Sequence, residues 1–124
     1  MLNILVVDDS TIIRRILVKE LTAMGYTVVA EAKSGKEAIG LYKKYLPDLV
    51  TMDITMPIMD GIQTLKKIRK IYSDANIIMI TSHGEEKLVM EAITSGAKGY
   101  VLKPITSLEL QIAMNKIFPE LKKR

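Results

Sequence analysis

The chain has no cysteine, no tryptophan, one histidine and one phenylalanine among its 124 residues. Without cysteine there can be no disulfide framework, cysteine-ligated zinc site, iron–sulfur cluster or thiol nucleophile. A single histidine excludes metal sites built from several histidines. Aromatic residues make up only 5% of the chain, which leaves little to stack on nucleic-acid bases.

Long hydrophobic runs are also absent. The longest, such as residues 4–7 and 77–80, have four residues, whereas a helix that spans a bilayer needs about 20. Two aspartates at positions 8 and 9 interrupt any signal-peptide core. We therefore expect a cytoplasmic protein with no membrane partner. The net charge of +4 only weakly indicates an acidic partner, because a lysine-rich solvated surface is the simpler explanation. No motif supports a nucleic-acid partner.

The composition that remains is that of a globular domain. Hydrophobic residues make up 48% of the chain and charged residues 26%, and a chain of this length buries enough surface to fold without disulfides or structural metals. The length fits one domain over residues 1–124. The chain starts at Met1 and ends soon after the last predicted helix, which favours a stand-alone protein that acts as a monomer.

Short runs rich in β-branched residues alternate with longer segments whose apolar residues recur every three or four positions. The predicted strands are Asn3–Val7, Val28–Ala32, Leu49–Met52, Ile77–Thr81 and Gly99–Leu102. Their starts lie 21 to 28 residues apart, which leaves room for a crossover helix after each strand. The pattern predicts an α/β fold in which a five-stranded parallel sheet carries helices on both faces.

Helix boundaries agree with this prediction. Four pairs have the spacing of a capping box at a helix start: Ser34 with Glu37, Asp60 with Gln63, Ser82 with Glu85, and Thr106 with Glu109. Gly25 and Gly96 stand where helices should end. The basic residues 122–124 are expected to form a frayed helix end.

Polar or charged residues stand at the carboxyl ends of four of the predicted strands. Asp8 and Asp9 follow the first strand, Asp53 the third and Lys103 the fifth, and Thr81 ends the fourth. Each is ordinary alone, since aspartate and serine after a strand often cap a helix. Unrelated helix caps, however, are not expected to gather at one edge of a sheet. Ligands of open α/β sheets bind at the carboxyl ends of the strands. The joint pattern therefore predicts a functional site at this edge.

The residue types narrow the chemistry of that site. Three carboxylates close together repel one another, and one ammonium does not balance them. Mg²⁺ would balance their negative charge, because it prefers a few carboxylates, water and phosphate oxygens as ligands. Asp53 could then act as a nucleophile toward phosphorus and form an aspartyl phosphate, while Lys103 and Thr81 stabilise charge on the transferred group.

Four segments carry a resemblance to a known family. They are residues 6–10 (VVDDS), 52–61 (MDITMPIMDG), 80–82 (ITS) and 99–104 (GYVLKP). In this order and at these spacings they resemble response-regulator receiver domains, and most closely the stand-alone chemotaxis members. The resemblance covers essentially the whole chain and implies a doubly wound, flavodoxin-like (βα)5 fold with strand order 2-1-3-4-5.

The resemblance also implies roles for the site residues. Asp53 would accept a phosphoryl group from a histidine kinase. Asp9 and Asp53 would bind Mg²⁺ directly, Asp8 through water and Thr55 through its backbone carbonyl. The protein would be a switch with Mg²⁺-dependent self-phosphorylation and self-dephosphorylation rather than an enzyme acting on a separate substrate.

The remaining roles concern the response to phosphorylation. Thr81 would hydrogen-bond the phosphoryl group, Lys103 would pair with it, and the Tyr100 ring would turn inward. The peptide bond between Lys103 and Pro104 is often cis in the family. The face made by the fourth helix, fifth strand and fifth helix would then bind a downstream partner such as a flagellar switch.

Thr55 and His83 occupy the two positions that tune phosphoryl lifetime in the family. Taken alone, His83 is more simply a solvated loop residue, although its charge near the site could respond to pH.

Other functions fit the residues less well. A haloacid-dehalogenase-type phosphatase would carry a second aspartate where Thr55 stands. A flavodoxin-like electron carrier would need a hydroxyl- and glycine-rich loop after the first strand, and the nucleotide-binding P-loop motif is absent. Within the receiver family, a phosphorelay intermediate and the receiver of a longer regulator remain alternatives to a chemotaxis switch.

Overall fold

The computed structural model describes residues 2–123, which form strands and helices in alternation. The strands are β1 Asn3–Val7, β2 Thr27–Ala32, β3 Leu49–Met52, β4 Ile77–Thr81 and β5 Gly99–Leu102. The helices are α1 Thr11–Ala23, α2 Gly35–Tyr45, α3 Gly61–Ile71, α4 Glu86–Thr94, α5 Ser107–Ile117 and the 3-10 helix η1 Pro119–Lys123. Four strands have the predicted bounds, and β2 begins one residue earlier than predicted, at Thr27.

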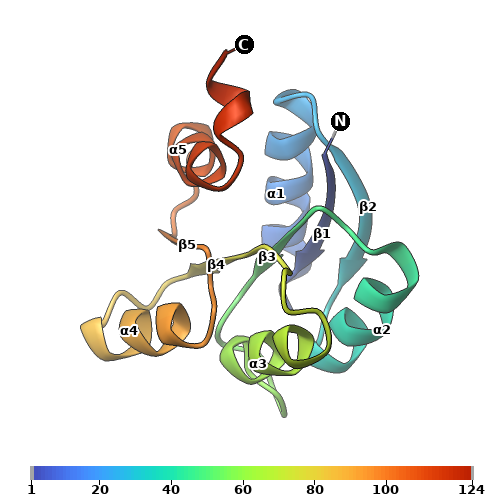
Figure 1. Cartoon of the computed structure of the whole chain (residues 1–124), viewed down its shortest axis with the longest axis vertical. Coiled ribbons are helices and arrows are strands. Elements are labelled where there is room, and N and C mark those ends of the chain that lie inside the picture. The colour runs from blue at the N-terminus through green and yellow to red at the C-terminus, as the bar shows by residue number, and fades with distance from the viewer. Residues whose placement is uncertain (1, 124) are drawn as a thin grey trace.

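All five strands form one parallel sheet in the order β2-β1-β3-β4-β5 (Figure 1). The predicted α/β class, the flavodoxin-like topology and the strand order are therefore confirmed. β1 lies beside β3 in the middle of the sheet, so the ends of these two strands are neighbours although they are far apart in the sequence. This neighbourhood brings Asp8 and Asp9 close to Asp53.

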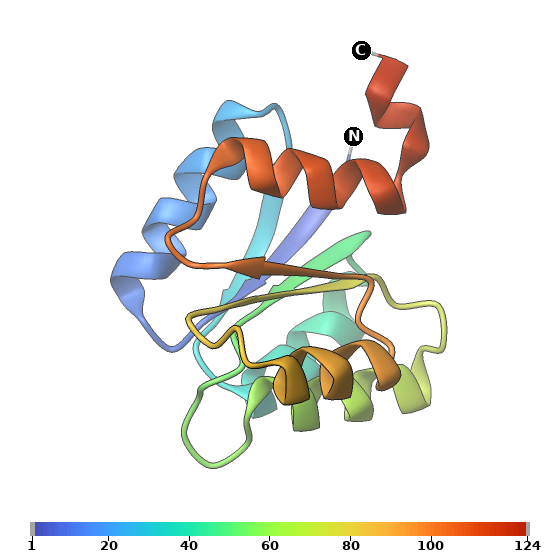
Figure 2. The same cartoon turned by 90° about the vertical axis from the view of Figure 1, so that its left-hand side faces the viewer.

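Helices cover both faces of the sheet, because alternate residues of each strand point to opposite sides. Ile4 and Val6 of β1 pack with α1 and α5, whereas Leu5 and Val7 pack with α2, α3 and α4. Figure 2 shows α1 and α5 on one side of the sheet and the other three helices on the opposite side. Both faces being buried explains why the strands are apolar runs rather than alternating patterns.

Three of the four predicted helix starts are confirmed. The side chains of Ser34, Asp60 and Thr106 each accept a hydrogen bond from the backbone N–H three residues later, and Asp60 with Gln63 forms a complete capping box. The prediction for Ser82 is wrong. α4 begins at Glu86, with Glu85 as an N-cap that forms no side-chain hydrogen bond. The segment between β4 and α4 instead has a local bond from the His83 N–H to Thr81 and a tertiary bond from Tyr100 to the His83 carbonyl.

The predicted helix ends are confirmed at both glycines. Gly25 follows α1 with φ +93° and Gly96 follows α4 with φ +109°, a conformation that side chains disfavour. Arg124 and the side chains of residues 122 and 123 lie outside the described part of the chain, and with them the expected basic helix end. Among residues 2–123 no helix combines the length and apolarity needed to cross a membrane.

Candidate functional site

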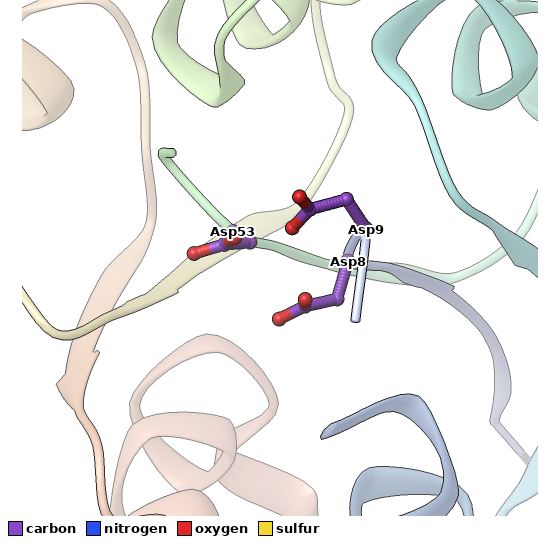
Figure 3. A group of neighbouring side chains, drawn as sticks. All are labelled: Asp8, Asp9 and Asp53. Carbon is purple, nitrogen blue, oxygen red and sulfur yellow. The ribbon is translucent and has the colours of Figure 1, made fainter. Parts of the chain in front are cut away.

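Three aspartates meet at the carboxyl edge of the sheet. Asp8 and Asp9 follow β1, Asp53 follows β3, and oxygen atoms of the three carboxylates lie within 4.8 Å of one another. Figure 3 shows their side chains directed to the same side of the strand ends. Asp8 and Asp53 are buried, at 1% and 5% exposure, whereas Asp9 is exposed. The structure therefore brings the predicted carboxylates together.

Lys103 reaches this cluster from the end of β5. Its Nζ lies 3.0 Å from Asp8 Oδ2 and 3.5 Å from Asp53 Oδ1. The other carboxylate oxygen of Asp8 accepts a 2.9 Å hydrogen bond from the Ser10 N–H. The peptide bond from Lys103 to Pro104 is cis, as the resemblance implied. One ammonium thus bridges the two buried carboxylates.

The cluster has too little positive charge to balance its carboxylates, and the raised pKa of Asp53 reflects this. The pKa of Asp53 is raised from 3.8 to about 6, first by burial and then by the negative charge of Asp8, with a smaller contribution from Asp9. Lys103 lowers the pKa but does not compensate. Three carboxylate ligands facing one ammonium are a donor set that fits Mg²⁺, a cation that prefers oxygen ligands.

Gly61, the first residue of α3, allows the start of that helix to pack directly against the backbone of Asp53. A Cβ atom on Gly61 would lie 2.0 Å from the Asp53 carbonyl oxygen. The Gly61 N–H donates to the Ile54 carbonyl at 2.7 Å, and the Asp53 N–H donates to the Val7 carbonyl at 3.0 Å. Gly61 belongs to the segment 52–61 that carries the family resemblance, but no role was predicted for it. The available signal was a glycine at the first position of a predicted helix, where glycine is a poor helix former.

Thr81, His83 and Tyr100 form a linked chain beside the cluster. Thr81 is fully buried at the end of β4, and its Oγ1 accepts a 3.2 Å hydrogen bond from the His83 N–H. The Tyr100 hydroxyl donates to the His83 carbonyl. Burial, followed by the charge of Glu85, raises the pKa of Tyr100. The segment after β4 is therefore tied to Thr81 on one side and to Tyr100 on the other.

The two predicted rate-tuning residues lie in different surroundings. Thr55 is exposed in the loop between β3 and α3, whereas His83 is half-buried, with Nδ1 3.8 Å from Glu85 Oε1. Their effect on phosphoryl lifetime stays a prediction.

This chain is similar to known proteins over most of its length. The response regulator receiver domain family matches residues 4–115. Chemotaxis protein CheY of Bacillus subtilis is 46% identical, over 92% of this chain and 95% of the relative. CheY of Thermotoga maritima is 44% identical, over 93% and 96%. The structure of a CheX-CheY-BeF3-Mg²⁺ complex from Borrelia burgdorferi matches with a TM-score of 0.91 at 36% identity, over 94% of this chain and 89% of the other.

Proposed function

Because the chain belongs to the response regulator receiver domain family, we propose that it is a two-component phosphorylation switch with Asp53 as its phosphoacceptor. The observation that carries this proposal is the convergence of Asp8, Asp9 and Asp53 with Lys103 at one edge of the sheet. Three chemotaxis proteins named CheY share 40–46% identity with this chain, and CheY-like receiver domains are phosphoacceptor switches rather than classical enzymes. We take residues 1–124 as one receiver domain.

In the proposed transfer, a carboxylate oxygen of Asp53 attacks the phosphorus of a phosphohistidine on the donor kinase. The P–O bond forms as the P–N bond breaks, and the imidazole nitrogen keeps the bonding electron pair. Lys103, already 3.5 Å from Asp53 Oδ1, and the hydroxyl of Thr81 would bind the transferred oxygens. Magnesium, held by Asp8, Asp9, Asp53 and the Thr55 carbonyl, would neutralise negative charge on the carboxylates and the phosphoryl group.

The signal is proposed to travel from Thr81 to Tyr100. A phosphoryl group on Asp53 would offer the Thr81 hydroxyl a new charged acceptor. Since the His83 N–H bonds to Thr81 and the His83 carbonyl accepts from Tyr100, movement of Thr81 would shift the population of Tyr100 orientations.

The proposed output surface is formed by α4, β5 and α5, which lie together at one side of the molecule (Figure 1). Large apolar side chains are exposed there: Met90, Ile93, Leu102, Leu108 and Ile112. A cavity of about 390 Å³ opens between these elements, and Tyr100 is part of its lining. Exposed apolar residues around a cavity are typical of protein-binding surfaces. A change in the orientation of Tyr100 would therefore alter the shape of this surface directly.

Chemotaxis is the pathway we propose, with a histidine kinase as donor and a flagellar switch as target, for a monomer acting in the cytoplasm. The relatives named chemotaxis proteins support it. A phosphorelay intermediate, or the receiver of a longer regulator, would use the same chemistry with another partner.

The proposal is tested by intact-protein mass after incubation with acetyl phosphate, with and without Mg²⁺. The wild type should gain one phosphoryl group only with Mg²⁺, and Asp53→Asn should gain none. A matched Asp74→Asn variant, which removes an exposed carboxylate near the end of α3, should behave as the wild type. No gain in the wild type, or an equal gain in Asp53→Asn, would show that Asp53 is not the phosphoacceptor.

A further inference from the structure

Arg14, near the start of α1, is bound on three sides next to the aspartate cluster. Its Nη1 donates to the Asp8 backbone carbonyl at 2.7 Å, its Nε to Glu31 Oε1 at 3.3 Å, and its Nη2 to Thr11 Oγ1 at 3.3 Å. Only 14% of the side chain is exposed. These bonds connect the end of β1, the first turn of α1 and the edge strand β2.

The Asp8 carbonyl lies where β1 has ended and α1 has not begun. The Asp8 N–H still belongs to the sheet, since it donates to the Ala32 carbonyl at 3.0 Å. The carbonyl instead belongs to the peptide unit that joins Asp8 to Asp9. Rotation of this peptide would move Asp9 relative to Asp8, and with it the spacing of two carboxylates of the cluster. Whatever holds that carbonyl therefore sets the geometry of the metal ligands.

An arginine suits this task better than a lysine. Its donors lie in one rigid plane, so three acceptors bound at once leave the guanidinium a single orientation. Its short bond is made to a carbonyl and not to a carboxylate of the cluster. The cation in contact with the carboxylates of Asp8 and Asp53 is Lys103. Arg14 thus acts on the position of the cluster rather than on its charge.

We propose that Arg14 is a positioning residue of the phosphorylation site: by binding the Asp8 carbonyl it fixes the Asp8–Asp9 peptide in the orientation that Mg²⁺ binding needs. This inference rests on the proposed function. It assigns to α1 a role in assembling the site, in addition to covering the sheet.

The test compares Mg²⁺ affinity, measured by calorimetry, in the wild type, Arg14→Lys, Arg14→Ala and Arg15→Ala. Arg14→Lys keeps the charge but cannot bind three acceptors in one plane, so its dissociation constant should rise about tenfold, as for other residues that orient metal ligands. Arg15, the exposed neighbour on α1, is the matched control and should leave the affinity unchanged. At saturating Mg²⁺ the phosphorylation rate of Arg14→Lys with acetyl phosphate should return to within about twofold of the wild type, because the defect lies in assembling the metal site.

Two results would overturn the inference. One is a wild-type Mg²⁺ affinity in both Arg14 variants. The other is an equal loss of Mg²⁺ affinity in Glu31→Gln. This variant weakens the link from Arg14 to β2 but leaves its bond to the Asp8 carbonyl, so the effect would then come from packing of α1 on β2. A wild type that binds no Mg²⁺ and gains no phosphoryl group would instead refute the proposed function itself, so the two failures are distinguishable.

Discussion

At the residue scale, the ionisation of Asp53 opposes folding. Its pKa of about 6 in the folded protein lies above the ordinary value of 3.8. A raised pKa means that the folded state binds the proton more tightly than the unfolded chain does. The associated stability is complete below pH 3.8 and is lost as the pH rises through 6. Near neutral pH the metal-free protein therefore carries an ionised, buried carboxylate at a cost of roughly 1–3 kcal/mol.

Asp53→Asn should relieve this cost. In EDTA at pH 7.5 we expect the variant to be more stable than the wild type by roughly 1–3 kcal/mol in urea unfolding, because no charge remains to be desolvated. The difference should vanish near pH 4. Asp74→Asn, which removes an exposed carboxylate, should change stability by less than about 0.5 kcal/mol. A less stable Asp53→Asn at pH 7.5 would contradict the charge argument.

Thr55 and His83 should affect the lifetime of the phosphoryl group rather than its formation. We expect His83→Ala and Thr55→Asn to change the dephosphorylation rate severalfold while both variants still gain one phosphoryl group. Both residues follow site residues by two positions, and His83 also contacts Thr81 through its N–H. The measurement is loss of the phosphorylated mass with time after the donor is removed. Unchanged rates in both variants would remove this role.

At the scale of elements, the approach of α3 to the end of β3 places Asp53. Ala at position 61 would set a methyl group 2.0 Å from the Asp53 carbonyl and 2.9 Å from the Ile54 Cα, and both are backbone atoms that cannot yield without moving the site. We expect Gly61→Ala to lose about 1–3 kcal/mol of stability and to phosphorylate more slowly than the wild type with acetyl phosphate.

Gly40→Ala is the matched control for that change. Gly40 lies inside α2 and has open space around the position of a Cβ atom. Because alanine favours helices more than glycine does, we expect this variant to gain about 0.5–1 kcal/mol and to phosphorylate normally. Urea unfolding and intact mass measure both variants. A Gly61→Ala protein as stable and as reactive as the wild type would show that the backbone approach is not required.

At the scale of the whole molecule, Mg²⁺ should stabilise the fold, since the three carboxylates are close together only when β1 and β3 are paired. A ligand that binds only the folded state stabilises it by about 1.4 kcal/mol at ten times its dissociation constant. We therefore expect the melting temperature to rise with MgCl2 more than with NaCl of equal ionic strength, which controls for screening.

Asp9→Ala should abolish that specific rise. Asp9 is exposed, so its removal leaves the core intact while the cluster loses one carboxylate. The measurement is a thermal melt monitored by circular dichroism with each salt. An Asp9→Ala protein that responds to Mg²⁺ as the wild type does would place the cation elsewhere.

Much of this molecule could be predicted from its sequence, because the deciding signals are local. Strand bounds follow from apolar runs, and three helix starts follow from Ser34, Asp60 and Thr106 with their partners three residues on. The convergence of Asp8 with Asp53 also follows, because the carboxyl ends of parallel strands share one edge.

The start of α4 could not be predicted. Ser82 has the right spacing to Glu85, yet the segment instead brings His83 to Thr81 and Tyr100. Local capping at Ser82 competes there with the contact between Tyr100 and the His83 carbonyl, which depends on the assembled sheet.

The sequence by itself therefore determined the fold class, the order of elements and the identity of the charged residues at the strand ends, because periodicity and chain direction are properties of neighbours in the chain. Only the tertiary structure decided that Gly61 must lack a side chain, that Lys103 bridges Asp8 and Asp53, and that Arg14 holds the Asp8 carbonyl. The Lys103 contacts join segments that meet only after the strands have paired. These contacts of Gly61 and Arg14 span only six to eight residues, but they depend on how α3 and α1 pack against the strand ends, which no pattern of residue types encodes.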